Sequence, residues 1–114
     1  MKNRLSMLAS ALFVSAFTLS STAYAAADAE AAKAMTKQNN CMKCHGIDKD
    51  KDGPSFKKTA AKYKGKADAE AKLITHLTTG PKIKLEDGTE EEHKAIKTKD
   101  TAAIKNLVQY ILEQ

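Results

Sequence analysis

Apolar residues near the end of the chain recur at the spacing of a helix with one buried face. They stand at i, i+3, i+4, i+7 and i+8 from the first of them. The five are Ile104, Leu107, Val108, Ile111 and Leu112. Asp100 precedes this run, and aspartate is favoured at a helix start because its side chain accepts a backbone N–H there. The pattern predicts a final helix from near Asp100 to about Glu113.

Two earlier stretches also have helical character. Residues 28–39 are rich in Ala, Glu, Lys and Met, which are strong helix formers, and Asp28 is a suitable first cap. Its inner face is predicted to consist of Ala31, Ala34, Met35 and Gln38. Residues 68–79 predict a second helix that ends at Gly80–Pro81, because proline cannot continue it. The apolar side of this helix carries Leu73, Ile74 and Leu77.

The other segments predict one short helix and two connections. Residues 54–62 form the short helix, with Pro54 in its first turn, where no N–H is needed. Residues 46–53 are polar and favour turns, and residues 82–99 form a long connection. No stretch alternates with the period of a strand. The predicted fold class is therefore all-α, with about four helices.

The first 25 residues have the pattern of a secretory signal peptide. Lys2 and Arg4 are followed by an apolar run over 7–19 and by Ala23-Tyr24-Ala25, a typical cleavage sequence. The apolar run is too short and too often interrupted by Ser and Thr for a membrane-spanning helix, which needs about 20 apolar residues. We predict a cleaved segment 1–25 and a mature domain 26–114 that lies in an oxidising compartment such as the bacterial periplasm.

The charge pattern gives no support to nucleic-acid binding. Removing Lys2 and Arg4 takes the formal charge from +5 to about +3. The lysines are mixed with Asp and Glu, and no aromatic residues are interleaved with them to stack on bases. A domain of this size buries a limited core and usually needs a covalent or metal-based support.

The stretch Cys41-Met42-Lys43-Cys44-His45 carries the most specific chemistry. Two thiols separated by two residues can add to the two vinyl groups of a porphyrin, and the next histidine can then reach the iron. This C-x-x-C-H spacing is typical of c-type haem attachment. The chain contains only these two cysteines. We predict one covalently bound haem c, with His45 as an iron ligand.

Three other interpretations of this motif are weaker. Structural zinc requires four Cys or His ligands in paired clusters, and His76 and His93 stand alone. A thioredoxin-like dithiol belongs in a βαβ unit, for which no strand pattern is present. A simple disulfide is compatible with an exported protein.

Beyond the motif, the chain resembles the small bacterial class I monohaem cytochromes c. The resemblance spans nearly all of residues 26–114 and includes Gly53-Pro54-Ser55-Phe56, the run 60–65, and the final helix. It implies that the first and last helices cross beside the haem. It also implies that the Pro54 carbonyl accepts a hydrogen bond from His45 Nδ1–H, which fixes the ring so that Nε2 faces the iron.

One position departs from that family. Such cytochromes supply a methionine to the iron from the loop before the last helix, and this loop contains none. The methionines stand elsewhere: Met1, Met7, Met35 and Met42. His93 lies in the loop instead, and imidazole is a good iron ligand. We predict ligation by His45 and His93. The alternatives to His93 as second ligand are an open or water-occupied iron, a lysine such as Lys82 or Lys84, and His76. His76 is interpreted as an exposed residue.

These features predict a periplasmic one-electron carrier rather than an enzyme, with no catalytic acid, base or nucleophile. Its partners would be periplasmic redox proteins, and it would be a monomer without a membrane span after signal removal. Lys43, Lys57 and Lys58 are candidate docking contacts. The alternative is a gas-binding or sensing protein, or a small haem enzyme, with an open or displaceable distal site; a thiol–disulfide oxidoreductase is a third hypothesis.

Overall fold

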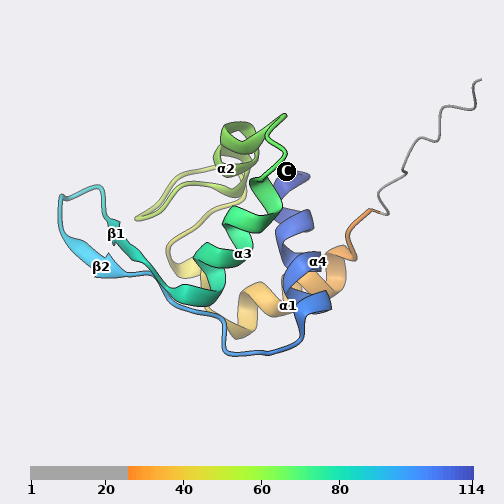
Figure 1. Cartoon of the computed structure of the whole chain (residues 1–114). Helices are drawn as coiled ribbons and strands as arrows, with labels where there is room; N and C mark the ends of the chain where they lie inside the picture. The colour runs from red at the N-terminus through yellow and green to blue at the C-terminus, as the bar shows by residue number, and fades with distance from the viewer. Residues whose placement is uncertain (1–25) are drawn as a thin grey trace, which may run out of the picture.

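The computed structural model describes residues 26–114, so the predicted signal peptide lies outside the described part. Four α-helices and one short hairpin follow in chain order (Figure 1). The elements are α1 (Ala29–Gln38), a 3₁₀ turn (Cys41–Lys43), α2 (Phe56–Tyr63), α3 (Ala69–Thr79), β1 (Lys82–Lys84), β2 (Glu90–Glu92) and α4 (Thr101–Leu112). The all-α prediction is confirmed, and no helix within 26–114 has the length and apolar character needed to cross a membrane.

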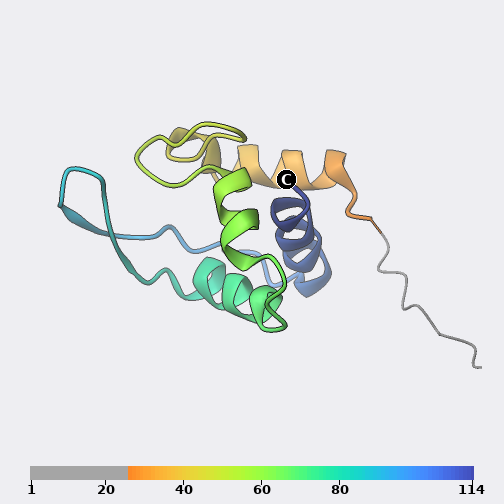
Figure 2. The same cartoon turned by 90° about the horizontal axis from the view of Figure 1, so that it is seen from above.

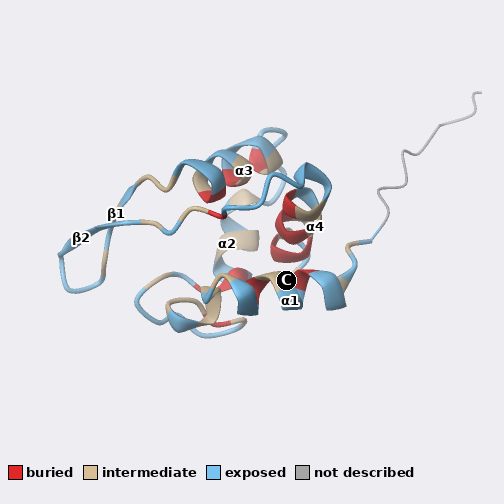
Figure 3. Cartoon of the chain, turned by 90° about the horizontal axis from the view of Figure 1, so that it is seen from below, coloured by how far each residue is buried: buried red, intermediate tan, exposed pale blue. Residues whose placement is uncertain are grey.

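Helix α4 is the centre of the fold. It packs against α1, α2 and α3, and it crosses α1 near the end of the chain (Figures 1 and 2). Leu107 and Val108 have 0% exposure. Figure 3 shows the buried residues of α1, α3 and α4 on the sides that face one another. The predicted stripe is confirmed except that Leu112 is half-buried, and Tyr110, which was not predicted, is also buried.

The helix ends follow local sequence chemistry. Asp28 accepts the N–H of Ala31, and Asp100 accepts the N–H of Ala103, each at 3.1 Å. Both predicted caps are therefore confirmed. Gly80 ends α3 in the left-handed region with φ of 58°, which costs glycine little.

Two helices differ in detail from the prediction. Helix α2 begins at Phe56, and Pro54 lies outside it, because Ser55 is the cap and its Oγ accepts the N–H of Lys58 at 3.1 Å. Helix α1 buries Ala32 and Thr36, whereas most of the predicted face is exposed. The hydroxyl of Thr36 donates to the Lys33 carbonyl, so this polar residue can be buried without an unsatisfied group.

The connection 82–99 contains a hairpin that sequence patterning did not predict. Lys82 lies opposite Glu92 and Lys84 lies opposite Glu90, so each exposed pair joins opposite charges, which stabilises neighbouring strands. Both strands are short and largely exposed. They therefore lack the apolar alternation by which a strand is recognised.

Asn106 links the start of α1 to α4. Its Oδ1 accepts the Asp28 N–H at 2.7 Å, and its Nδ2 donates to the Asp28 carbonyl at 2.9 Å. We expect Asn106→Ala to lower the free energy of unfolding by about 1–2 kcal/mol, because two hydrogen bonds are lost at a partly exposed site. Chemical denaturation of the holoprotein measures this. Lys105→Ala, at an exposed neighbouring position, is the control, and equal effects of the two variants would contradict the assignment.

Candidate functional site

The Cys41–His45 segment forms a single tight turn directly after α1. Asn40 adopts the left-handed conformation, with φ of 52°, so the chain leaves the direction of α1 at this residue. The N–H groups of Cys44 and His45 then both donate to the Cys41 carbonyl, at 3.2 and 3.0 Å. Both cysteines are half-buried. The turn therefore holds the two thiols and the imidazole within five consecutive residues of one compact backbone segment.

The Cys41 thiol is not activated as a redox thiol would be. Burial raises the pKa of Cys41, while a backbone hydrogen bond and the charge of Lys94 act in the opposite direction. Cys41 therefore stays protonated at neutral pH. Redox-active C-x-x-C motifs depend instead on a lowered thiol pKa, so the raised pKa of Cys41 gives no support to disulfide exchange.

His45 is held by the loop that follows it. Its Nδ1 lies 2.6 Å from the Pro54 carbonyl oxygen, so the hydrogen bond implied by the resemblance is present. This contact assigns a proton to Nδ1 and leaves Nε2 as the ring nitrogen that can bind a metal. Gly53 packs against the ring, since a Cβ there would lie 2.8 Å from His45 Cε1. Any larger residue at position 53 would displace the imidazole.

His93 lies directly after β2 and is held through its backbone. Its N–H donates to the Pro81 carbonyl at 2.9 Å, and a Cβ on Gly80 would come 2.5 Å from the His93 carbonyl oxygen. A little further on, the N–H of Ile96 donates to the Leu77 carbonyl at 2.8 Å, and the Ile96 side chain is buried. The end of α3 and the core thus fix the position of His93.

The His93 ring is half-buried and incompletely satisfied. Its Nδ1 is buried and has no hydrogen-bond partner among the described residues. Leaving such an atom unpaired costs about 1–3 kcal/mol. Burial lowers the pKa of His93, and the nearby rings of His76 and His45 add to this, against a backbone contact with Lys94. The imidazole is therefore neutral at pH 7, which is the form that binds metals.

The fold brings His45 and His93 together from opposite parts of the sequence. Their ring centroids are 6.0 Å apart and their planes differ by 49°. A metal ion bound to one nitrogen of each ring would need two bonds of about 2 Å each, as in zinc–imidazole sites, plus the two ring radii. The observed centroid separation is close to this span.

A hollow lies between the loop after His45 and the hairpin before His93. Its volume is about 400 Å³, and its lining includes Gly53, Pro54, Lys84 and Leu85. Asp52, Lys58 and Glu86 also line this hollow, whereas the two cysteines and the two histidines do not. It therefore neighbours the His45–His93 pair and is not itself lined by these candidate haem-binding residues.

The structure corrects the interpretation of His76 as an exposed residue. His76 is half-buried, and its ring centroid lies 4.4 Å from that of His93. Burial lowers the pKa of His76, followed by the charges of His45 and Lys62. Its spacing from Leu73 and Leu77, at i+3 and i−1, places it at the edge of the buried stripe of α3. That spacing was the available signal in the sequence.

The other candidate residues lie at the surface or in the core. Lys82 and Lys84 are exposed on β1. Met35 and Met42 are partly buried against the hydrophobic core. The candidate docking residues are all exposed: Lys43, Lys57 and Lys58.

Comparison with known proteins agrees with this geometry. Residues 29–114 match the family described as cytochrome c. The chain belongs to the cytochrome c family. This family assignment and the four-helix architecture identify a class I monohaem cytochrome c, which contains one covalently bound haem c.

Two solved structures are similar to this cytochrome. A crystal structure of class 1 cytochrome MtoD from Sideroxydans lithotrophicus ES-1 is 63% identical with a TM-score of 0.75, covering 77% of this chain and 97% of that one. Wild-type Nitrosomonas europaea cytochrome c552 is 29% identical with a TM-score of 0.55, covering 70% and 95%.

Among curated sequences, cytochrome c-551 of Pseudomonas aeruginosa is 40% identical over 52 residues, which are 46% of this chain and 50% of the relative. The chain spans about half the length of the curated relatives it matches.

Proposed function

We propose that this cytochrome is a periplasmic one-electron carrier whose haem iron is ligated by His45 and His93. Cys41 and Cys44 would hold the porphyrin through two thioether bonds. The observation that supports this most is the pair of half-buried imidazoles at 6.0 Å. One ring is oriented by the Pro54 carbonyl, and the other has a buried nitrogen without a partner.

When bound, the haem supplies an iron that gains and loses one electron at a potential set by its axial ligands. His45 would donate a hydrogen bond from Nδ1–H to the Pro54 carbonyl oxygen and so present Nε2 to the iron. His93 would be the second ligand and would exclude water and small substrates from the iron. The side chains therefore anchor, orient and shield, and none is required to act as a catalytic acid or base.

Charge and ligand type both favour the oxidised state in this proposal. Methionine–histidine ligation raises a haem potential, so a second imidazole gives a lower one. The segment 82–94 adds net negative charge, because its five carboxylates outnumber its three lysines; the carboxylates are Glu86, Asp87, Glu90, Glu91 and Glu92, and the lysines are Lys82, Lys84 and Lys94. These carboxylates stabilise the more positive ferric iron, and salt weakens their effect because they are exposed.

The location and partners belong to the same proposal. Cleavage of residues 1–25 would release a monomeric domain 26–114 into the periplasm, where redox proteins donate and accept the electron. Exposed lysines, including Lys43 and Lys57, would steer an acidic partner toward the haem edge. A gas-binding role is the second candidate. It requires that the His93 side chain leave the iron while its backbone stays bonded to Pro81, and the exposure of both neighbours, Glu92 and Lys94, is the observation that favours it.

Carbon monoxide binding by the reduced holoprotein at neutral pH separates these two functions. We expect slow or absent binding, because His45 and His93 would both hold the iron and leave no site for carbon monoxide. Stopped-flow spectroscopy after mixing with carbon monoxide measures it. Rapid, high-affinity binding would instead establish an open or displaceable distal site and overturn the assignment as a simple carrier.

A further inference from the structure

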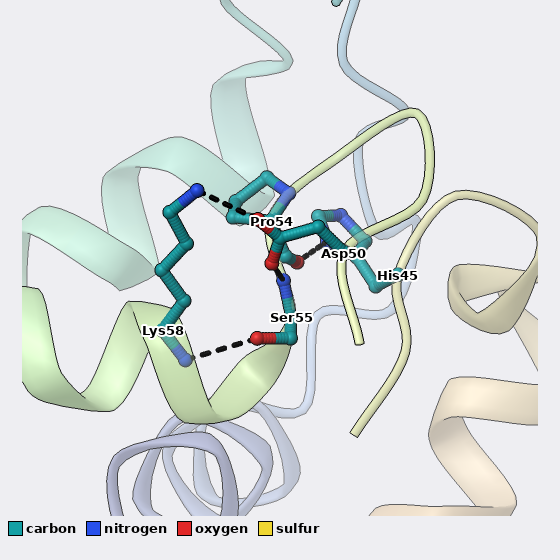
Figure 4. Close-up of polar contacts among 5 residues, drawn as sticks. All are labelled: His45, Asp50, Pro54, Ser55 and Lys58. Carbon is teal, nitrogen blue, oxygen red and sulfur yellow. Dashed lines mark hydrogen bonds and ion pairs between the residues drawn. The ribbon is translucent and has the colours of Figure 1, made fainter. Parts of the chain in front are cut away.

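The peptide bond between Pro54 and Ser55 is hydrogen-bonded on both of its sides. Its carbonyl oxygen accepts from His45 Nδ1 at 2.6 Å. Its N–H donates to Asp50 Oδ1 at 2.8 Å. Figure 4 shows the resulting chain of contacts, from the Asp50 carboxylate through the peptide to the imidazole. A carboxylate is thereby connected to the ring of His45 without touching it.

The Asp50 side chain is itself fixed. Its second oxygen accepts from Lys58 Nζ at 2.6 Å, an interaction also drawn in Figure 4. The hydrogen bond from Lys58 lowers the pKa of Asp50, and the Ser55 N–H lowers it further. Asp50 is therefore ionised at neutral pH.

The loop around this peptide leaves it little freedom. His45 and Asp50 form an isolated antiparallel bridge. Gly53 N–H donates to the Cys44 carbonyl at 2.8 Å, and Phe56 N–H donates to the Gly46 carbonyl at 2.9 Å. Because these contacts hold the loop on both sides of it, the Pro54–Ser55 peptide has one orientation. A change in the hydrogen bond at its N–H therefore affects the hydrogen bond at its carbonyl.

An anionic acceptor on one side of a peptide changes the other side. Hydrogen bonds to a charged group are shorter and stronger than neutral ones, and hydrogen bonds in a chain polarise one another. The Asp50 carboxylate accepts the Ser55 N–H and polarises the peptide bond, which makes the Pro54 carbonyl oxygen a stronger hydrogen-bond acceptor. A stronger acceptor at Nδ1 makes an imidazole a more basic metal ligand at its other nitrogen.

We propose that Asp50 is a positioning residue for His45, which orients and polarises the Pro54–Ser55 peptide and so lowers the reduction potential of the haem. Lys58 moderates the effect by sharing the carboxylate. This inference rests on the proposed ligation by His45, and it adds a specific residue that controls the strength of that ligand.

The chain contains a matched control for this proposal. Asp48 and Lys57 form a second ion pair on the same loop and helix, at 3.8 Å, and neither of these two side chains bonds to the Pro54–Ser55 peptide. Asp50→Asn and Asp48→Asn remove the same charge from neighbouring positions. Asparagine can still accept the Ser55 N–H through its oxygen, so Asp50→Asn removes the charge while retaining an acceptor.

The experiment measures two properties of each holoprotein: the reduction potential by voltammetry, and the NMR signal of the His45 Nδ1 proton in the reduced state. We expect Asp50→Asn to shift the potential upward by more than Asp48→Asn does, and to move the Nδ1 proton signal, which Asp48→Asn leaves in place. Lys58→Met frees the carboxylate and is expected to shift the potential downward by more than Lys57→Met. Ser55→Ala removes the helix cap but keeps the backbone N–H, so its potential stays near that of the wild type.

Equal shifts within each matched pair, or an unmoved His45 proton signal in Asp50→Asn, would overturn the proposal. If Asp50→Asn does not fold, the Lys58→Met and Lys57→Met pair decides the question in the same way. Failure of the proposed function is recognised separately. In that case the wild-type protein itself shows no low-spin haem with histidine ligation, whatever the variants do.

Discussion

Replacement of His93 by alanine is expected to convert the ferric haem from low spin to high spin and to open the reduced haem to carbon monoxide. Two imidazoles give a strong ligand field, and a water molecule in place of one does not. Low-temperature electron paramagnetic resonance of the ferric protein measures the change. Because the His93 backbone is held by Pro81 and Gly80, the variant is expected to retain the fold and the covalently bound haem.

The proximity of His76 requires a second variant. Its ring lies 4.4 Å from that of His93, so His76 could take the vacated position in His93→Ala. The double variant His76→Ala/His93→Ala removes that substitute, and His76→Ala alone is the control, which should remain low spin. Low-spin spectra in both His93→Ala and the double variant would show that His93 is not the ligand.

The double replacement Cys41→Ala/Cys44→Ala is expected to abolish covalent haem attachment and, with it, most of the stability of the domain. A chain of this size buries a limited core and usually needs a covalent or metal-based support, and a covalently bound haem would add a large apolar body to that core. The free energy of unfolding would fall by about 5 kcal/mol or more, which is the whole stability of many small domains.

Two measurements test the cysteine variant. Haem staining after denaturing electrophoresis reports covalent attachment, and far-UV circular dichroism during heating reports cooperative unfolding. Lys43→Ala, which changes an exposed side chain in the same turn, should leave both unchanged. A haem-free double variant with a native-like spectrum and a sharp melting transition would contradict the view that the haem completes the core.

The elements that were predicted correctly depend on local interactions. Asp28 and Asp100 cap their helices through N–H groups three residues away, and the stripe of α4 follows from helical periodicity. The predicted buried face of α1 was wrong. An Ala-rich helix has several similar faces, and packing against α4 decides which of them is buried. The hairpin was missed because charge pairing across strands, here Lys82 with Glu92, becomes visible only when the register is known.

By itself, the sequence determined the chemistry that is contained within one turn of chain: two thiols and an imidazole at fixed covalent spacing, and hence the prediction of a covalently bound haem. It also named His93 as the second candidate ligand, since the expected methionine was missing. Only the tertiary structure brought the ring of His93 to 6.0 Å from that of His45, set His76 beside His93, and connected Asp50 to the ring of His45 through a peptide bond. These contacts join segments whose approach depends on the packing of α3 and α4 and on loop hydrogen bonds, so no short-range pattern encodes them.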